Sequence, residues 1–147
     1  MSPGFEVTNL GMRYGKAQVL SEVNLRFDFS QLTALAGPNG AGKSTLLGIL
    51  SRLRRDFSGE CKYRGQSIAK WRADSFAREV AYVPQSMRSE FPFSAEQMVL
   101  MGRSPHVSGM FESKQDREAA AKAMAQTDRI MVLSRRALRR SSTAIRW

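Results

Sequence analysis

The sequence contains almost no cysteine and no long apolar run. Cys61 is the only cysteine among 147 residues, which excludes an internal disulfide and a cysteine-rich metal site. No apolar stretch approaches the roughly 18 residues that a membrane-spanning helix needs. The first residues, MSPGFEVTNL, lack the basic and apolar segments of a secretory signal. These absences lead us to expect a cytoplasmic protein.

Acidic residues are absent from the end of the chain. The formal net charge is +10, but the segment after Asp128 holds six Arg and neither Asp nor Glu. The preceding residues carry 17 basic against 13 acidic side chains, a surplus of only four. Charge gathered in a tail is weak support for a nucleic-acid-binding face. We therefore divide the chain into a folded part, 1–128, and a basic segment, 129–147, which we expect to be disordered.

In the first half of the chain, the spacing of apolar residues changes from a period of two to a helical period. Phe5, Val7 and then residues 23–29 alternate with polar neighbours, which predicts antiparallel strands. The continuous apolar run at 32–37, LTALAG, predicts a strand buried on both faces. Apolar residues recur at helical spacing over 46–53 and predict a helix there.

The second half of the chain contains short elements with clear boundaries. Both later helices are expected to begin with a capping box, formed by Ser94 with Gln97 and by Ser113 with Asp116. The predicted elements are an exposed strand at 60–65, a helix at 73–79, a second buried strand at 80–83, and helices at 94–102 and about 113–126.

The most specific motif is GPNGAGKST, which fits the pattern G-x-x-x-x-G-K-[ST] of loops that bind nucleotide phosphates. It lies between the apolar run and the helical pattern, the context that this motif requires. Its glycines allow backbone N–H groups to approach phosphate oxygens at a helix N-terminus. We expect Lys43 to reach the β- and γ-phosphates and Ser44 to bind Mg²⁺. The candidate site comprises Gly37, Pro38, Asn39, Gly40, Ala41, Gly42, Lys43, Ser44 and Thr45.

Two neighbouring motifs flank this loop: MRYG, which contains Tyr14, comes before it, and VAYVPQ, which ends at Gln85, comes after it. In this order the three motifs resemble the ATP-binding subunits of ABC transporters, over residues 5 to about 127. The resemblance implies that Tyr14 stacks on adenine and that Gln85 contacts Mg²⁺ or the attacking water. It also implies an α/β fold, namely an incomplete P-loop NTPase core of the ABC ATPase type. That core would carry an N-terminal antiparallel β subdomain and the start of a helical subdomain.

A finer resemblance lies in FPFSAEQMVLMGRSPH, because importers of iron chelates, haem and cobalamin carry a similar GR-x-PH element. Arg103, Pro105 and His106 match that element here. The resemblance implies a subunit that energises such an importer with ATP and Mg²⁺, forms a homodimer, and binds membrane permease subunits at the inner face of the cell membrane. A lone loop histidine is more often an ordinary polar surface residue, so the transported ligand stays open.

The motifs that this family uses for hydrolysis are missing from the rest of this sequence. No Asp or Glu occurs after Asp128, no LSGGQ signature is present, and no histidine comes after His106. We therefore expect an N-terminal fragment, with residues 1–128 as a partial ABC ATP-binding domain that binds ATP but hydrolyses little. Residues 129–147 would then be either the product of a shifted reading frame near 128–134 or a genuine short form.

Two other functions stay open from the sequence. One is an ABC-type ATPase outside transport, such as one in DNA repair. The other is a basic nucleic-acid-binding fragment, because Arg135, Arg136, Arg139 and Arg140 are clustered. No aromatic residue is interleaved with that cluster before Trp147, so we expect no direct nucleic-acid partner.

Overall fold

The computed structural model describes residues 3–85, 93–107 and 112–141, and the side chains of the last stretch as far as residue 127. These residues belong to two compact units, Met1–Val83 and Pro84–Trp147. The elements of the first unit are strands β1 Phe5–Tyr14, β2 Ala17–Phe27, β3 Ser58–Tyr63 and β4 Gln66–Ser67, helices α1 Lys43–Leu50 and α2 Ala73–Glu79, and the 3₁₀ turn η1 Ile68–Lys70. Those of the second are helices α3 Ala95–Met101 and α4 Lys114–Ser141 and the 3₁₀ turn η2 Ser104–His106.

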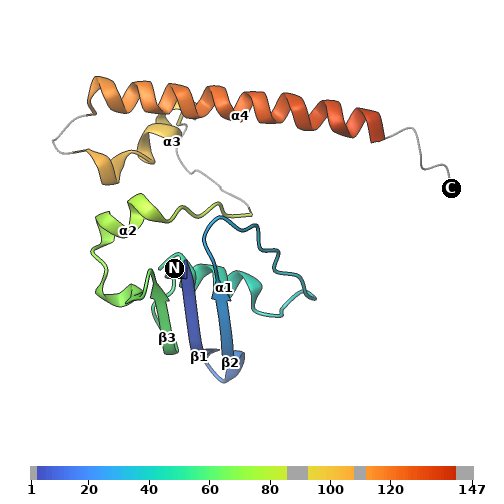
Figure 1. Ribbon diagram of the computed structural model, residues 1–147, viewed down its shortest axis with the longest axis vertical. Coiled ribbons are helices and arrows are strands. Elements are labelled where there is room, and N and C mark those ends of the chain that lie inside the picture. The colour runs from blue at the N-terminus through green and yellow to red at the C-terminus, as the bar shows by residue number, and fades with distance from the viewer. Residues whose placement is uncertain (1–2, 86–92, 108–111, 142–147) are drawn as a thin grey trace. The chain divides into compact units, whose positions relative to one another are not determined.

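The first unit is built on a four-stranded sheet in the order β2-β1-β3-β4; β3, β1 and β2 lie side by side in Figure 1. Every pairing in it is antiparallel, as the period of two predicted for the start of the chain. A tight turn at Gly15 and Lys16 joins β1 to β2 and pairs Tyr14 with Ala17. β1 therefore ends with Tyr14 at a defined place, next to the first residue of β2.

The core of this unit lies between one face of the sheet and the helices. α1 contributes Leu46, Ile49 and Leu50 to a single buried cluster. The sheet and the elements after it contribute Val7, Leu10, Met12, Leu20, Cys61, Tyr63, Ile68 and Phe76. Each such side chain stabilises the fold by about 1.5–3 kcal/mol when it is fully buried. The predicted exposed strand at 60–65 is therefore wrong on one face, because β3 buries Cys61 and Tyr63.

The two predicted buried strands at 32–37 and 80–83 are also wrong. Both segments are irregular, and every residue of 32–37 is exposed, with Leu32 completely so. Val83 is 89% exposed. A strand needs a hydrogen-bonded neighbour, and within the described residues neither segment pairs with one. Apolar side chains are uncovered around the phosphate loop, because Leu35 and Leu47 are exposed.

The second unit consists of helices. α3 begins with the predicted capping box, in which Gln97 N–H donates to Ser94 Oγ at 3.2 Å and Ser94 N–H donates to Gln97 Oε1 at 2.8 Å. α4 continues to Ser141, well beyond the predicted end near 126 (Figure 1). The backbone of 129–141 is helical, where disorder was expected, and the division of the chain at residue 128 stays a prediction. The composition of 114–141 favours a helix, because this stretch contains no Gly or Pro and is rich in Ala and Arg. The remaining tail, 142–147, lies outside the described residues.

Candidate functional site

The phosphate loop leads directly into α1. Gly42 is the residue before the helix and has φ +81° and ψ 6°, in the left-handed region that favours glycine. A Cβ at this position would lie 2.7 Å from Leu20 Cδ2 and 2.9 Å from the Val19 carbonyl oxygen. Only glycine fits at position 42, because the backbone there is left-handed and because β2 leaves no room for a Cβ. This contact fixes the loop to the sheet.

The loop before Gly42 is open. Residues 37–41 are exposed, and Gly40 has φ +84° with nothing within 4 Å of an added Cβ. A turn is closed by the Ala41 N–H, which donates to the Pro38 carbonyl at 3.3 Å. The loop thus has free space beside Gly40, which a phosphate cradle requires.

Lys43 is the first residue of α1, and its amino group reaches back over the loop. Nζ donates to the carbonyl oxygens of Gly37 and Pro38, at 2.7 Å each. These bonds hold the positive charge of Lys43 against the backbone of the loop. The contact with two neutral carbonyls leaves that charge uncompensated, since no ion pair of Lys43 occurs in the described part of the chain. A phosphate is the kind of ligand that would compensate it.

The start of α1 favours anions for two further reasons. Its first turn contains no acidic residue, and its N-cap is Gly42, which has no side chain to accept a hydrogen bond from the first N–H groups. Ser44 has an exposed side chain at this end, and Thr45 is partly exposed. No group of three or more His, Cys, Asp or Glu that could bind a metal occurs within the described residues. A Mg²⁺ ion at Ser44 would then take most ligands from phosphate oxygens and water.

Tyr14 lies at the end of β1 with 43% of its surface exposed. The guanidinium carbon of Arg54 lies 5.5 Å from the centre of its ring, within the range of a cation–π contact. This contact could not be predicted from the sequence, because forty residues separate the two side chains. Tyr14 and the phosphate loop are both positioned by β2, Tyr14 through its pairing with Ala17 and the loop through Leu20.

Gln85 and the GR-x-PH element belong to the second unit. Gln85 is exposed and lies outside any helix or strand, so its role at the metal stays a prediction. Pro105 and His106 form the short turn η2, and His106 is exposed. Arg103 is engaged within its own unit, since Nε lies 3.1 Å from Oδ1 of Asp116.

Asp116 is the one charged residue that is buried in the described part of the chain, at 5% exposure. The Ser113 hydroxyl donates to its Oδ2 at 2.6 Å, and the Ser113 N–H donates to the same oxygen at 3.0 Å. These two hydrogen bonds, with a further contribution from Arg103, lower the pKa of Asp116. The predicted capping box at Ser113 is confirmed. Its carboxylate, Asp116, also holds Arg103 in an ion pair that the sequence did not indicate.

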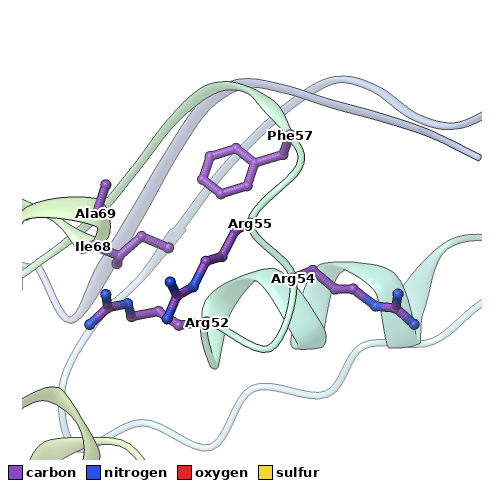
Figure 2. Close-up of a pocket in the computed structure, with 6 residues that line it drawn as sticks. All are labelled: Arg52, Arg54, Arg55, Phe57, Ile68 and Ala69. Carbon is purple, nitrogen blue, oxygen red and sulfur yellow. The ribbon is translucent and has the colours of Figure 1, made fainter. Parts of the chain in front are cut away.

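A separate cavity of about 230 Å³ lies beyond the end of α1 (Figure 2). Its lining consists of Arg52, Arg54, Arg55, Phe57, Ile68 and Ala69. It is smaller than the roughly 300–1,000 Å³ typical of ligand pockets, and no phosphate-loop residue lines it. Arg54 lines this cavity and also contacts Tyr14 of the candidate nucleotide site. None of the helices in the described residues combines the length and the hydropathy that a bilayer crossing requires.

Comparisons with known proteins agree with the motifs. The ABC transporter family matches residues 20–144 of this chain. The hemin import ATP-binding protein HmuV of Pseudomonas entomophila (strain L48) is 37% identical over 123 residues, which cover 84% of this chain and 47% of that protein. HmuV of Plesiomonas shigelloides is 43% identical over 101 residues, which cover 69% of this chain and 38% of that protein. The chain thus spans less than half of these relatives.

Solved structures of ABC transporters have a similar fold. An inward-facing ABC transporter of metal-chelate type superimposes with a TM-score of 0.65 and 28% identity, covering 87% of this chain and 46% of that one. A bacterial Atm1-family ABC exporter with ATP bound superimposes with a TM-score of 0.66 and 27% identity, covering 88% of this chain and 22% of that one. The two proteins are described as different kinds of transporter, so these likenesses indicate the shared ATPase fold.

Proposed function

This chain belongs to the ABC transporter family, and from that premise we propose that it is the ATP-binding part of a subunit that energises an importer. The observation that carries the proposal is an intact phosphate loop, with the Lys43 amino group held over it, in a chain similar to hemin import ATP-binding proteins. Family membership implies transport-coupled ATP hydrolysis for the complete subunit.

In this proposal, the chain contacts ATP at its phosphates and at its adenine base. The backbone of 37–42 and the start of α1 hold the phosphates, and Lys43 reaches the β- and γ-phosphates. Tyr14 stacks on adenine. Ser44 and Gln85 are the proposed ligands of Mg²⁺, which neutralises charge on the phosphates when it is bound.

The proposed cargo is haem, a siderophore–iron complex or cobalamin. Haem comes first because the relatives at 34–43% identity that match over most of this chain are hemin import proteins. The proposed partners are membrane permease subunits and a second ATP-binding subunit. These partners would place the protein at the cytoplasmic face of the cell membrane.

ATP binding tests the proposal directly. Calorimetric titration of the purified chain with ATP and Mg²⁺ is expected to show binding that Lys43→Ala weakens at least tenfold, because the variant loses a charge-assisted contact to phosphate. Lys70→Ala is the matched control: it removes the same charge from an exposed position in η1 and should leave the affinity unchanged. Equal affinities of wild type and Lys43→Ala would contradict the proposal.

Hydrolysis by this chain is expected to be very slow. No carboxylate after Asp128 is available to orient water or to hold Mg²⁺, and no LSGGQ signature is present to complete a partner's site. Phosphate release from radiolabelled ATP should therefore stay near the rate without protein. Rapid turnover that Lys43→Ala abolishes would show that the chain supplies its catalytic groups in another way.

A further inference from the structure

Arg54 is held over Tyr14 by the end of α1. The helix stops at Leu50, and Arg52 adopts φ +61°, a left-handed conformation that turns the chain back on itself. The Arg54 N–H then donates to the Gly48 carbonyl at 2.9 Å. These features fix the backbone of Arg54 relative to the helix that begins with Lys43.

The side-chain stem of Arg54 is also fixed. A Cβ on Gly48 would lie 3.0 Å from Arg54 Cγ, so glycine at this position leaves just enough room for the stem to lie along α1. The guanidinium group then reaches the Tyr14 ring, with its carbon 5.5 Å from the ring centre. Arg54 thus connects the helix of the phosphate loop to the aromatic residue at the end of β1.

The three arginines at this end of α1 do not act alike. Figure 2 shows Arg52 and Arg55 pointing toward the side of Ile68, whereas Arg54 points the opposite way along α1. Arg52 donates from Nη1 to the Trp71 carbonyl at 3.0 Å and lies over the Phe76 ring. No ion pair of Arg54 occurs in the described part of the chain, so the Tyr14 ring is the contact that orients its charge.

We propose that Arg54 is a positioning residue for the nucleotide base, because it holds the Tyr14 ring by one face and leaves the other face to the base. This inference rests on the proposed function and adds a residue that the motifs do not contain. Tyr14 stays 43% exposed with Arg54 against it, so the ring keeps surface for a second planar group. A guanidinium, an aromatic ring and a base would then form one stack, which orients the base relative to α1.

The test compares a ligand that has a base with one that lacks it. ATP and inorganic tripolyphosphate, each with Mg²⁺, are titrated calorimetrically into wild type, Arg54→Ala and Arg55→Ala. Arg54→Ala is expected to weaken ATP binding about two- to fivefold, which corresponds to an exposed cation–π contact, and to leave tripolyphosphate binding unchanged. Arg55→Ala removes the same charge one residue further on and should bind both ligands as wild type does.

A second pair of variants separates the stack from general effects. In a Tyr14→Ala background, Arg54→Ala should have no additional effect on ATP affinity, because the ring that it holds is gone. The far-ultraviolet circular dichroism of each variant shows whether it is folded. An effect of Arg54→Ala that persists without Tyr14 would overturn the inference.

The remaining outcomes also decide the matter. Equal weakening of ATP and tripolyphosphate would mean that Arg54 acts on the phosphates, and tighter ATP binding would mean that it occupies the face needed by the base. Either result overturns the role of Arg54 and leaves the proposed function intact. Failure of wild type to bind both ligands would overturn the proposed function, and the inference with it.

Discussion

Gly42→Ala is expected to destabilise the first unit more than any other single methyl group added to the phosphate loop. Alanine at φ +81° costs about 1–2 kcal/mol because an L residue is strained in the left-handed region. The new Cβ would also lie 2.7 Å from Leu20 Cδ2 and 2.9 Å from the Val19 carbonyl, and such overpacking costs about 1–3 kcal/mol. The expected total is therefore about 2–5 kcal/mol.

Gly40→Ala provides the matched comparison, because the two glycines have nearly the same φ and differ in their surroundings. Gly40 has φ +84°, but nothing lies within 4 Å of an added Cβ. Its substitution should cost only the conformational strain of about 1–2 kcal/mol. The difference between the two variants then measures the contact between the loop and β2.

Urea unfolding, followed by the fluorescence of Trp71, is the assay. Trp71 packs against the core of the same unit, so its emission should report unfolding of the part that contains the loop. The free energy of unfolding should fall in the order wild type, Gly40→Ala, Gly42→Ala. Equal losses for the two variants would refute the reasoning, since they would show that β2 does not constrain the loop at Gly42.

Two further predictions concern titratable groups. Burial raises the pKa of the Cys61 thiol to about 11, so the thiol stays protonated at pH 8 and should react only slowly with Ellman's reagent. Unfolding in guanidinium should expose the thiol and make the reaction fast. Fast reaction of the folded chain would show that Cys61 of β3 is not buried. Hydrogen bonds from Ser113 and the charge of Arg103 lower the pKa of Asp116, so its contribution to stability is present above the unfolded value of about 3.9 and is lost as the pH falls through the lower folded value. Asp116→Asn should therefore weaken helix α4 at pH 7 and flatten the loss of helical circular dichroism below pH 4, while an unchanged acid profile would show that this carboxyl group does not couple pH to folding.

Local patterns were sufficient for several elements. The period of two at Phe5 and Val7 predicted the antiparallel start, and residues 73–79 form helix α2 with the predicted ends. The capping boxes at Ser94 and Ser113 are confirmed because they depend only on residues three apart. Such features could be predicted from the sequence because neighbouring residues determine them.

Features that need distant partners were not predictable in the same way. The apolar run at 32–37 has the composition of a buried strand, but a strand forms only beside another strand. Likewise, β3 buries one face because its Tyr63 packs against Trp71 and Phe76, which lie later in the chain. The helical backbone after Asp128 could not be predicted for another reason. The Arg and Ala residues of this segment suit both a disordered chain and a helix.

The sequence by itself predicted a loop that binds phosphate, because glycine, lysine and serine at fixed spacing are typical of a backbone cradle with one positive charge. It also determined the family, through Tyr14 and Gln85 in their order around that loop. Only the tertiary structure decided that β2 packs against Gly42 and that Arg54 lies over Tyr14. These contacts join residues 22 and 40 positions apart, and chain folding alone brings such residues together.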